Sequence, residues 1–138
     1  TQVLLGWWSA LYNTRPLQGR DTGGLFRIMA NIYTIYADHK ESISALEFVK
    51  KMNLFLDKLV EQKKMNSYRV TRMKLGFRSM DLPEFRIDME FDNMQQLDDA
   101  MTVTIHDKSV DKVHVGFNQF VDVETIQHFL YRDYPDEQ

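Results

Sequence analysis

Two polar side chains near the end of the chain, His114 and Asn118, are of types that could carry acid–base chemistry. An imidazole titrates near neutral pH and can move a proton at a reacting centre. The surrounding residues 112–121 alternate between apolar and polar types, which predicts a strand with both side chains on its polar face. His114 and Asn118 are therefore the candidate catalytic residues. The alternative is that His114 is a polar residue hydrogen-bonded across a dimer interface.

Five further side chains could surround a small apolar or aromatic ligand on the same predicted sheet. Tyr33 and Tyr36 belong to a run of β-branched and aromatic residues that predicts the first strand. Together with Phe120 they would bound the pocket. Arg72 or Arg86 would hold an anionic group of the ligand, because a guanidinium pairs well with carboxylates and phosphates.

We expect neither a metal nor a cofactor. The four histidines, His39, His106, His114 and His128, show no helical or tight-turn ligand spacing. The chain has no cysteine, which excludes a thiolate nucleophile, a disulfide and a cysteine-based zinc site. The glycine pair at 23–24 has neither the spacing nor the lysine of a phosphate-binding loop.

The composition is typical of one folded domain. A length of 138 residues suits a single core, and 43% hydrophobic with 27% charged residues is ordinary globular usage. A net charge of −3 with dispersed basic residues argues against a nucleic-acid partner. No apolar run approaches the roughly 20 residues of a membrane helix, so we expect no membrane partner and no targeting segment. Without cysteine the chain suits a reducing compartment, and we expect a cytoplasmic location.

The first 24 residues differ from the remainder, because they are rich in tryptophan, glycine and polar residues without a sustained period of 2 or 3.6. Met29 directly precedes the first predicted strand. We expect residues 1–28 to be either an upstream extension or a native arm whose Trp7, Trp8 and Tyr12 dock on the domain. Residues 29–138 would form a single domain.

The rest of the chain alternates between strand and helix patterns. A long amphipathic helix follows Ser44 and Glu47, which have the spacing of a capping box. A second helix is expected to begin at Asp92, and the last strand to span residues 112–121. Ile126, Phe129 and Leu130 then predict a short amphipathic helix at the C-terminal end.

Residues 68–77 and 84–91 both alternate with period 2 and flank a turn that contains Pro83, which predicts a hairpin. The expected register places apolar pairs on one side: Phe77 with Phe85, Leu75 with Ile87 and Met73 with Met89. It places opposite charges on the other side: Lys74 with Asp88 and Arg72 with Glu90. Such cross-strand pairs stabilise a sheet.

This order, βαββαβ over residues 30–121, resembles the ferredoxin-like fold and, more narrowly, the dimeric α+β barrel proteins. The resemblance is nearest to small uncharacterised bacterial members. It implies an α+β fold with a four-stranded antiparallel sheet and helices on one face. Two such sheets would face each other in a homodimer, with a pocket between sheet and helices or inside the barrel.

The predicted open face of the sheet also suits self-association, because it mixes aromatic side chains with complementary charges. Its members are Tyr33, Arg72, Lys74, Arg86, Asp88, His114, Asn118 and Phe120. The sequence leaves two functions open. One is a non-catalytic dimeric module that binds a small apolar or aromatic molecule, or only a second copy of itself. The other is a cofactor-independent monooxygenase or isomerase-like enzyme that uses His114 and Asn118, so whether the protein is an enzyme is undecided.

Overall fold

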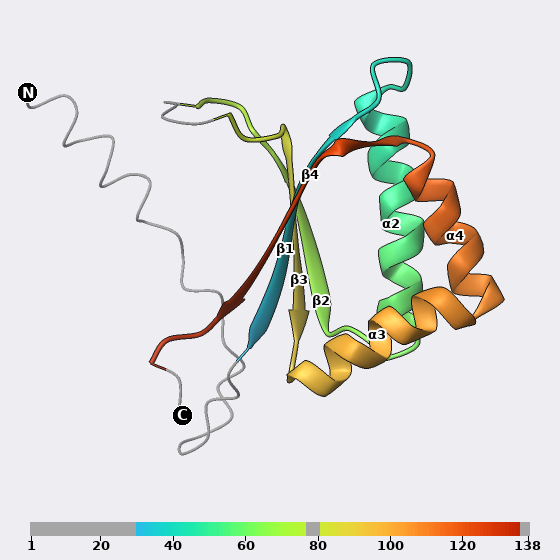
Figure 1. Ribbon diagram of the computed structural model, residues 1–138, viewed down its shortest axis with the longest axis vertical. Coiled ribbons are helices and arrows are strands. Elements are labelled where there is room, and N and C mark those ends of the chain that lie inside the picture. Colours follow the sequence, from blue (N-terminus) through green and yellow to red (C-terminus); the bar gives the residue numbers. More distant parts are fainter. Residues whose placement is uncertain (1–29, 77–80, 136–138) are drawn as a thin grey trace, which may run out of the picture.

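The computed structural model describes residues 30–76 and 81–135. The expectations for residues 1–28 and for Phe77 therefore lie outside the described residues. The elements, in chain order, are β1 (Asn31–His39), α2 (Ala45–Glu61), β2 (Ser67–Arg72), β3 (Phe85–Phe91), α3 (Met94–His106), α4 (Lys108–Asn118) and β4 (Val121–Arg132). The strands form one antiparallel sheet in the order β2-β3-β1-β4, and the described helices lie on one of its faces (Figure 1). The expected α+β class and ferredoxin-like architecture are confirmed.

The two faces of the sheet follow from the alternation of side chains along β3. Phe85, Ile87, Met89 and Phe91 point to the helices and are buried, while the residues between them point to the open face. The pairing of β1 with β3 then fixes the faces of β1. Tyr33 pairs with Met89 on the helix side, whereas Tyr36 pairs with Arg86 on the open side.

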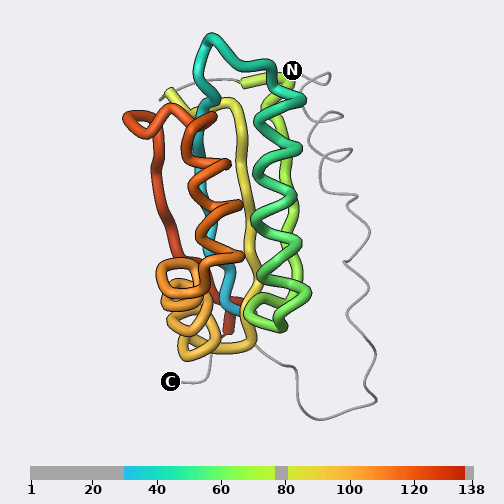
Figure 2. The backbone as a smooth tube through the Cα atoms, turned by 90° about the vertical axis from the view of Figure 1, so that its right-hand side faces the viewer, coloured from blue at the N-terminus to red at the C-terminus, as the bar shows by residue number. Residues whose placement is uncertain are grey.

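Phe48 of α2 is the centre of the core. It is fully buried, and its ring lies 5.2 Å from that of Phe85 and 5.6 Å from that of Phe117 in α4. Helices α2 and α4 lie side by side over the sheet (Figure 2). The expected capping box is confirmed, because Ser44 and Glu47 bond reciprocally at the start of α2.

The last quarter of the chain differs from the sequence prediction. Residues 108–118 form helix α4 instead of a strand, and the expected C-terminal helix is part of strand β4. The cause is a strong N-cap: Asp107 Oδ1 accepts hydrogen bonds from the backbone N–H groups of Ser109 and Val110. Val110 and Phe117 then face the core two turns apart, and this packing outweighs the low helix propensity of the segment.

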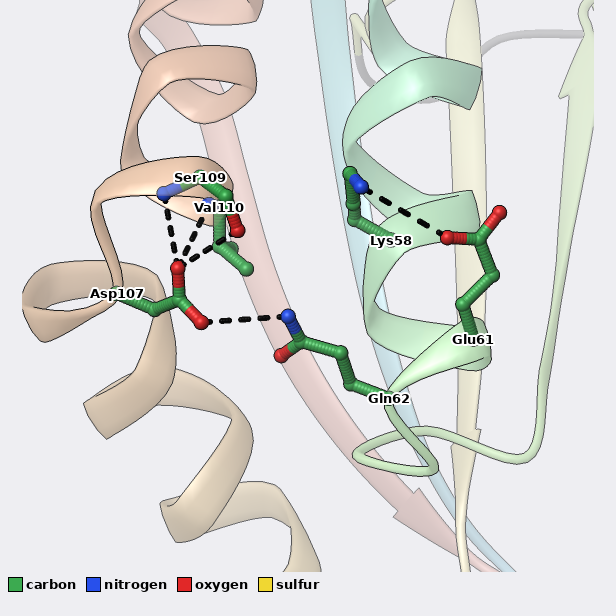
Figure 3. A network of polar contacts seen from close by, with 6 residues as sticks. All are labelled: Lys58, Glu61, Gln62, Asp107, Ser109 and Val110. Carbon is green, nitrogen blue, oxygen red and sulfur yellow. Dashed lines mark hydrogen bonds and ion pairs between the residues drawn. The ribbon is translucent and has the colours of Figure 1, made fainter.

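Asp107 also ties α4 to α2. Its Oδ2 accepts a hydrogen bond of 3.3 Å from the amide of Gln62, the residue that caps the end of α2, as Figure 3 shows. The preceding helix, α3, begins at Met94, and its N-cap is Asn93, one residue after the expected cap at Asp92. Polar contacts at the helix ends therefore set where the chain turns before β4.

The hairpin exists, but its register differs from the prediction. Ile87 pairs with Val70 and Met89 with Tyr68, so β2 is displaced by five residues from the expected pairing. An odd displacement exchanges the two faces of the strand. Leu75 accordingly lies in the connection after β2 and is 68% exposed. The observed register prevails because it turns Tyr68 and Val70 toward the core, against which both pack.

The reassignment of residues 108–118 to a helix predicts that Gly116→Ala stabilises the protein. Apart from its chain neighbours and the backbone of its own helix, no heavy atom lies within 4 Å of the position that a Cβ of residue 116 would take. Alanine costs less backbone entropy than glycine in a helix, so the free energy of unfolding should rise by about 0.5–1 kcal/mol. Urea denaturation measures this change, and a loss of stability would contradict the helix.

Candidate functional site

A groove between α2 and the β2–β3 side of the sheet is the first candidate site. It has a volume of about 500 Å³ and is lined by Val49, Asn53, Tyr68, Val70, Arg72 and Phe85. Three of these side chains are apolar, and they come from the helix and from both strands. The register of β2 builds this wall, because it directs Tyr68, Val70 and Arg72 to the helix side.

Polar groups stand around this groove. The Tyr68 hydroxyl donates a 2.7 Å hydrogen bond to Asp57 of α2. Burial, with the bond to Asp57 and its charge, raises the pKa of Tyr68 to about 12, so the phenol stays protonated. The guanidinium of Arg72 lies 5.8 Å from the centre of the Phe85 ring, and its Nε forms an ion pair with Glu84. The groove thus combines apolar walls with one cationic group.

Aromatic side chains gather on the open face of the sheet. Tyr36 and Phe129 meet edge to face at 5.9 Å, and Phe129 lies 6.4 Å from Tyr131. The guanidinium of Arg86 stands 5.9 Å from the Tyr36 ring. Phe129 and Tyr131 are 42% and 50% exposed. We call these four residues the aromatic patch.

The charge of Arg86 is balanced within the same face. Its Nε lies 3.1 Å from Asp88, which also accepts a 2.6 Å hydrogen bond from the hydroxyl of Thr34. Burial opposes the charged form of Arg86, but Asp88, Tyr36 and Tyr131 outweigh it and raise the pKa of Arg86. The open face therefore carries a fixed, charge-balanced cluster beside exposed aromatic rings.

A second pocket, of about 660 Å³, lies between the β2–β3 connection and β4. Its lining includes four carboxylates, those of Asp38, Asp81, Glu84 and Glu124. Asp38 already accepts a 2.6 Å hydrogen bond from the Glu84 backbone. Among residues 30–76 and 81–135, no group of three or more His, Asp or Glu side chains could hold a metal ion.

The candidate catalytic residues lie in the helix layer and not on the sheet. His114 and Asn118 are one turn apart on α4, with His114 Nε2 3.2 Å from the Asn118 amide nitrogen. The imidazole packs against Phe55 of α2 at 4.8 Å between ring centres. Neither residue lines the two pockets. The expectation that they share a sheet face was wrong, because α4 replaces the predicted strand.

The five expected ligand-binding residues are divided among four regions. Tyr36 and Arg86 meet on the open face, and Arg72 lines the groove. Tyr33 lies on the helix side, where its hydroxyl is 2.5 Å from Nδ1 of His128. Phe120 lies at the junction of α4 and β4, with the ammonium of Lys51 5.7 Å from its ring centre. Within residues 30–76 and 81–135, Tyr33 and Tyr36 therefore lie on opposite faces of the sheet and do not line one pocket with Phe120.

Sequence reasoning missed Phe129 and Tyr131, because they were placed in a C-terminal helix. The pattern that could have found them is the alternation of residues 126–131, in which His128 and Leu130 share one face and Phe129 and Tyr131 the other. It also missed Val49 and Asn53, which stand one helical turn apart on α2. Val49 and Asn53 line a groove only in the observed register of β2, and the predicted register was wrong.

A family model described as a family of unknown function, DUF6614, matches residues 29–138. The chain belongs to this family. No curated protein sequence matches it. In the part of the chain that the structure describes, no helix is long and apolar enough to cross a membrane.

Solved structures share the fold of this DUF6614 protein at low sequence identity. A dimeric ferredoxin-like protein of unknown function from Jannaschia has a TM-score of 0.57 at 8% identity, covering 74% of this chain and 97% of its own. The hydroxynitrile lyase of Passiflora edulis has a TM-score of 0.59 at 9% identity, covering 81% and 100%. SnoaB, a cofactor-independent oxygenase from Streptomyces nogalater, has a TM-score of 0.54 at 11% identity, covering 80% and 100%. Identities this low establish the fold alone.

The packing of His114 predicts a pH dependence of stability. Burial against α2 lowers the pKa of His114 below its usual 6.5, although Asp111 acts in the opposite direction. The folded state thus favours neutral imidazole. The neutral His114 side chain makes its full contribution to the free energy of unfolding above about pH 6.5. This contribution is lost as the pH falls through the lowered pKa.

When the pH is lowered from about 7.5 to about 5, the free energy of unfolding should therefore fall less in His114→Gln than in the wild type. Urea denaturation at both pH values measures the difference. His106→Gln, at an exposed position, is the matched control and should keep the wild-type dependence. Equal losses in the wild type and His114→Gln would contradict the account.

Proposed function

We propose that this DUF6614 protein is a homodimeric α+β barrel module. Two copies pack through the open faces of their sheets, and each copy binds a small apolar or aromatic molecule in the groove between α2 and the sheet. The observation that carries the proposal is the aromatic patch of Tyr36, Arg86, Phe129 and Tyr131. It stands on a sheet face that none of the described helices covers.

The chemistry of the open face suits contact with a second copy. Exposed apolar surface that is contiguous and surrounded by polar groups favours association. The Arg86–Asp88 pair neutralises the charge at the centre of the face, so two identical faces can meet without net repulsion. The Jannaschia protein of the same fold is described as dimeric, which supports this arrangement.

The groove suits a small organic ligand. Its volume of about 500 Å³ falls within the range of pockets that hold such molecules, roughly 300–1,000 Å³. Val49, Val70 and Phe85 supply apolar walls, and Asn53 and Arg72 supply the few polar groups that orient a ligand.

We further propose a cytoplasmic location in a bacterial cell. The lack of cysteine is compatible with a reducing compartment, and proteins of the same fold from Jannaschia and Streptomyces support a bacterial source. A net charge of −3 supports the absence of a nucleic-acid partner.

The dimer proposal predicts that Phe129→Glu separates the subunits. A carboxylate buried at the centre of the interface without a partner should weaken association roughly a hundredfold or more. Native mass determination and light scattering over a range of protein concentrations measure the change. Leu46→Glu, on the exposed side of α2, is the control and should remain dimeric. A monomeric wild type, or a dimeric Phe129→Glu variant, would exclude this interface.

A cofactor-independent monooxygenase or isomerase-like enzyme is the second candidate. It is favoured by the contact of His114 with Asn118 and by the lowered pKa of His114, which leaves a neutral imidazole able to accept a proton at neutral pH. SnoaB, described as a cofactor-independent oxygenase, has the same fold.

This alternative predicts turnover of hydroquinone-type aromatic compounds in air. Loss of a general base typically lowers kcat by roughly a hundredfold or more, so His114→Ala should show such a loss. Oxygen uptake and product analysis provide the assay, with His106→Ala as the control. Unchanged turnover in His114→Ala would remove His114 from any catalytic role.

A further inference from the structure

The charge within the groove indicates what kind of ligand it takes. Arg72 is the single charged side chain among the six that line the groove. The Tyr68 hydroxyl is occupied by Asp57, and its pKa of about 12 keeps it protonated, so Tyr68 contributes chiefly its ring to the wall. The groups left to recognise a polar substituent are the Asn53 amide and the Arg72 guanidinium.

The guanidinium of Arg72 is held in place before any ligand arrives. Its Nε is bound to Glu84, and its plane lies near the Phe85 ring, with 5.8 Å between Cζ and the ring centre. Its two Nη groups make no hydrogen bond to the residues that the structure describes, and 47% of the side chain is exposed. A guanidinium held in this way, whose Nη groups are not occupied by the described residues, suits the two oxygens of a carboxylate.

Glu84 is positioned as an internal counter-ion. It lies at the start of β3 and also lines the second pocket, so the Arg72–Glu84 pair stands between the two pockets. The Glu84 backbone is fixed independently, by N–H donation to Asp38 and by its carbonyl accepting from Met73. Its side chain can therefore be changed without removing these backbone contacts.

We infer that the groove binds an organic anion, a compact apolar or aromatic molecule whose carboxylate pairs with the Nη groups of Arg72. The inference rests on the ligand-binding function proposed for the groove. The apolar body of the ligand lies against Val49, Val70 and Phe85, and Asn53 bonds to its polar edge. Glu84 remains on Nε and lowers the affinity, because its charge repels the ligand carboxylate.

The test compares charged and uncharged probes of the same shape. Benzoate and naphthoate are titrated into the full chain by calorimetry, alongside benzamide and naphthamide. Arg72→Gln should weaken carboxylate binding roughly ten- to a hundredfold, the loss expected for a charge-assisted hydrogen bond, and leave amide binding unchanged. Glu84→Gln should strengthen carboxylate binding by roughly three- to tenfold, because a competing negative charge is removed.

Two controls separate the groove from general charge effects. Arg69→Gln removes the same charge from the opposite face of β2 and should leave carboxylate affinity unchanged. Val49→Trp fills the groove and should weaken both probe classes. Carboxylate selectivity that is lost in Arg72→Gln and enhanced in Glu84→Gln supports the inference.

The failures are distinguishable. If carboxylates and amides bind equally and Val49→Trp weakens both, the groove is a ligand site but the anion inference is overturned. If Arg69→Gln weakens carboxylate binding as much as Arg72→Gln, the effect is one of net charge and the inference is likewise overturned. Binding of neither probe class overturns both the inference and the proposed ligand-binding function.

Discussion

The contact of Phe48 with the sheet and with α4 is the interaction on which the architecture depends. One buried ring touches Phe85 on β3 and Phe117 on α4, so it holds α2 and α4 against the same face of the sheet. Because the described helices are gathered on that face, the opposite face is left to solvent or to a partner. The one-sided core therefore creates the surface that the proposed dimer uses.

The two sides of the sheet consequently offer different chemistry. On the helix side, the edge strand β2 reaches past the buried core and forms a groove with α2, in which Arg72 is the charged group. On the open side, the charge of Arg86 in the aromatic patch is neutralised by its ion pair with Asp88. A balanced, aromatic face suits a contact between proteins, whereas a partly enclosed groove with one cation suits a small ligand.

Much of the architecture could be predicted from local patterns. The first strand, the capped helix α2 and the alternation of β3 each have a signal within a few residues, and all three are present. Helix α4 could not be recognised in the same way, because Val113 and Val115 alternate with polar residues as they would in a strand. Its formation depends on the Asp107 cap and on packing of Val110 and Phe117, which involves residues distant in sequence.

The candidate site was predicted less well than the fold, for a related reason. A displacement of β2 by an odd number of residues exchanges its faces, and this moved Arg72 from the expected open face into the groove. Reassigning α4 moved His114 and Asn118 off the sheet altogether. Arg86 kept its expected place on the open face because the alternation of β3 was predicted correctly. Tyr33 was wrongly expected on the open face: it pairs with Met89 on the helix side, and Tyr36 takes the open side instead. A site residue was thus placed on the correct face only where the alternation within its own strand decided that face.

The central claim is that two copies meet through the open faces of their sheets. Because the chain has no cysteine, a single nitroxide label can be attached after Thr71→Cys on the open face of β2, or after Lys112→Cys on α4. Electron–electron distance measurement on each labelled protein tests the claim directly. Packed sheets lie about 10 Å apart, so the account predicts a short distance between labels at residue 71 and a longer one at residue 112. The account would be contradicted if no label-to-label distance between subunits were detected, or if the distance at residue 112 were shorter than the distance at residue 71.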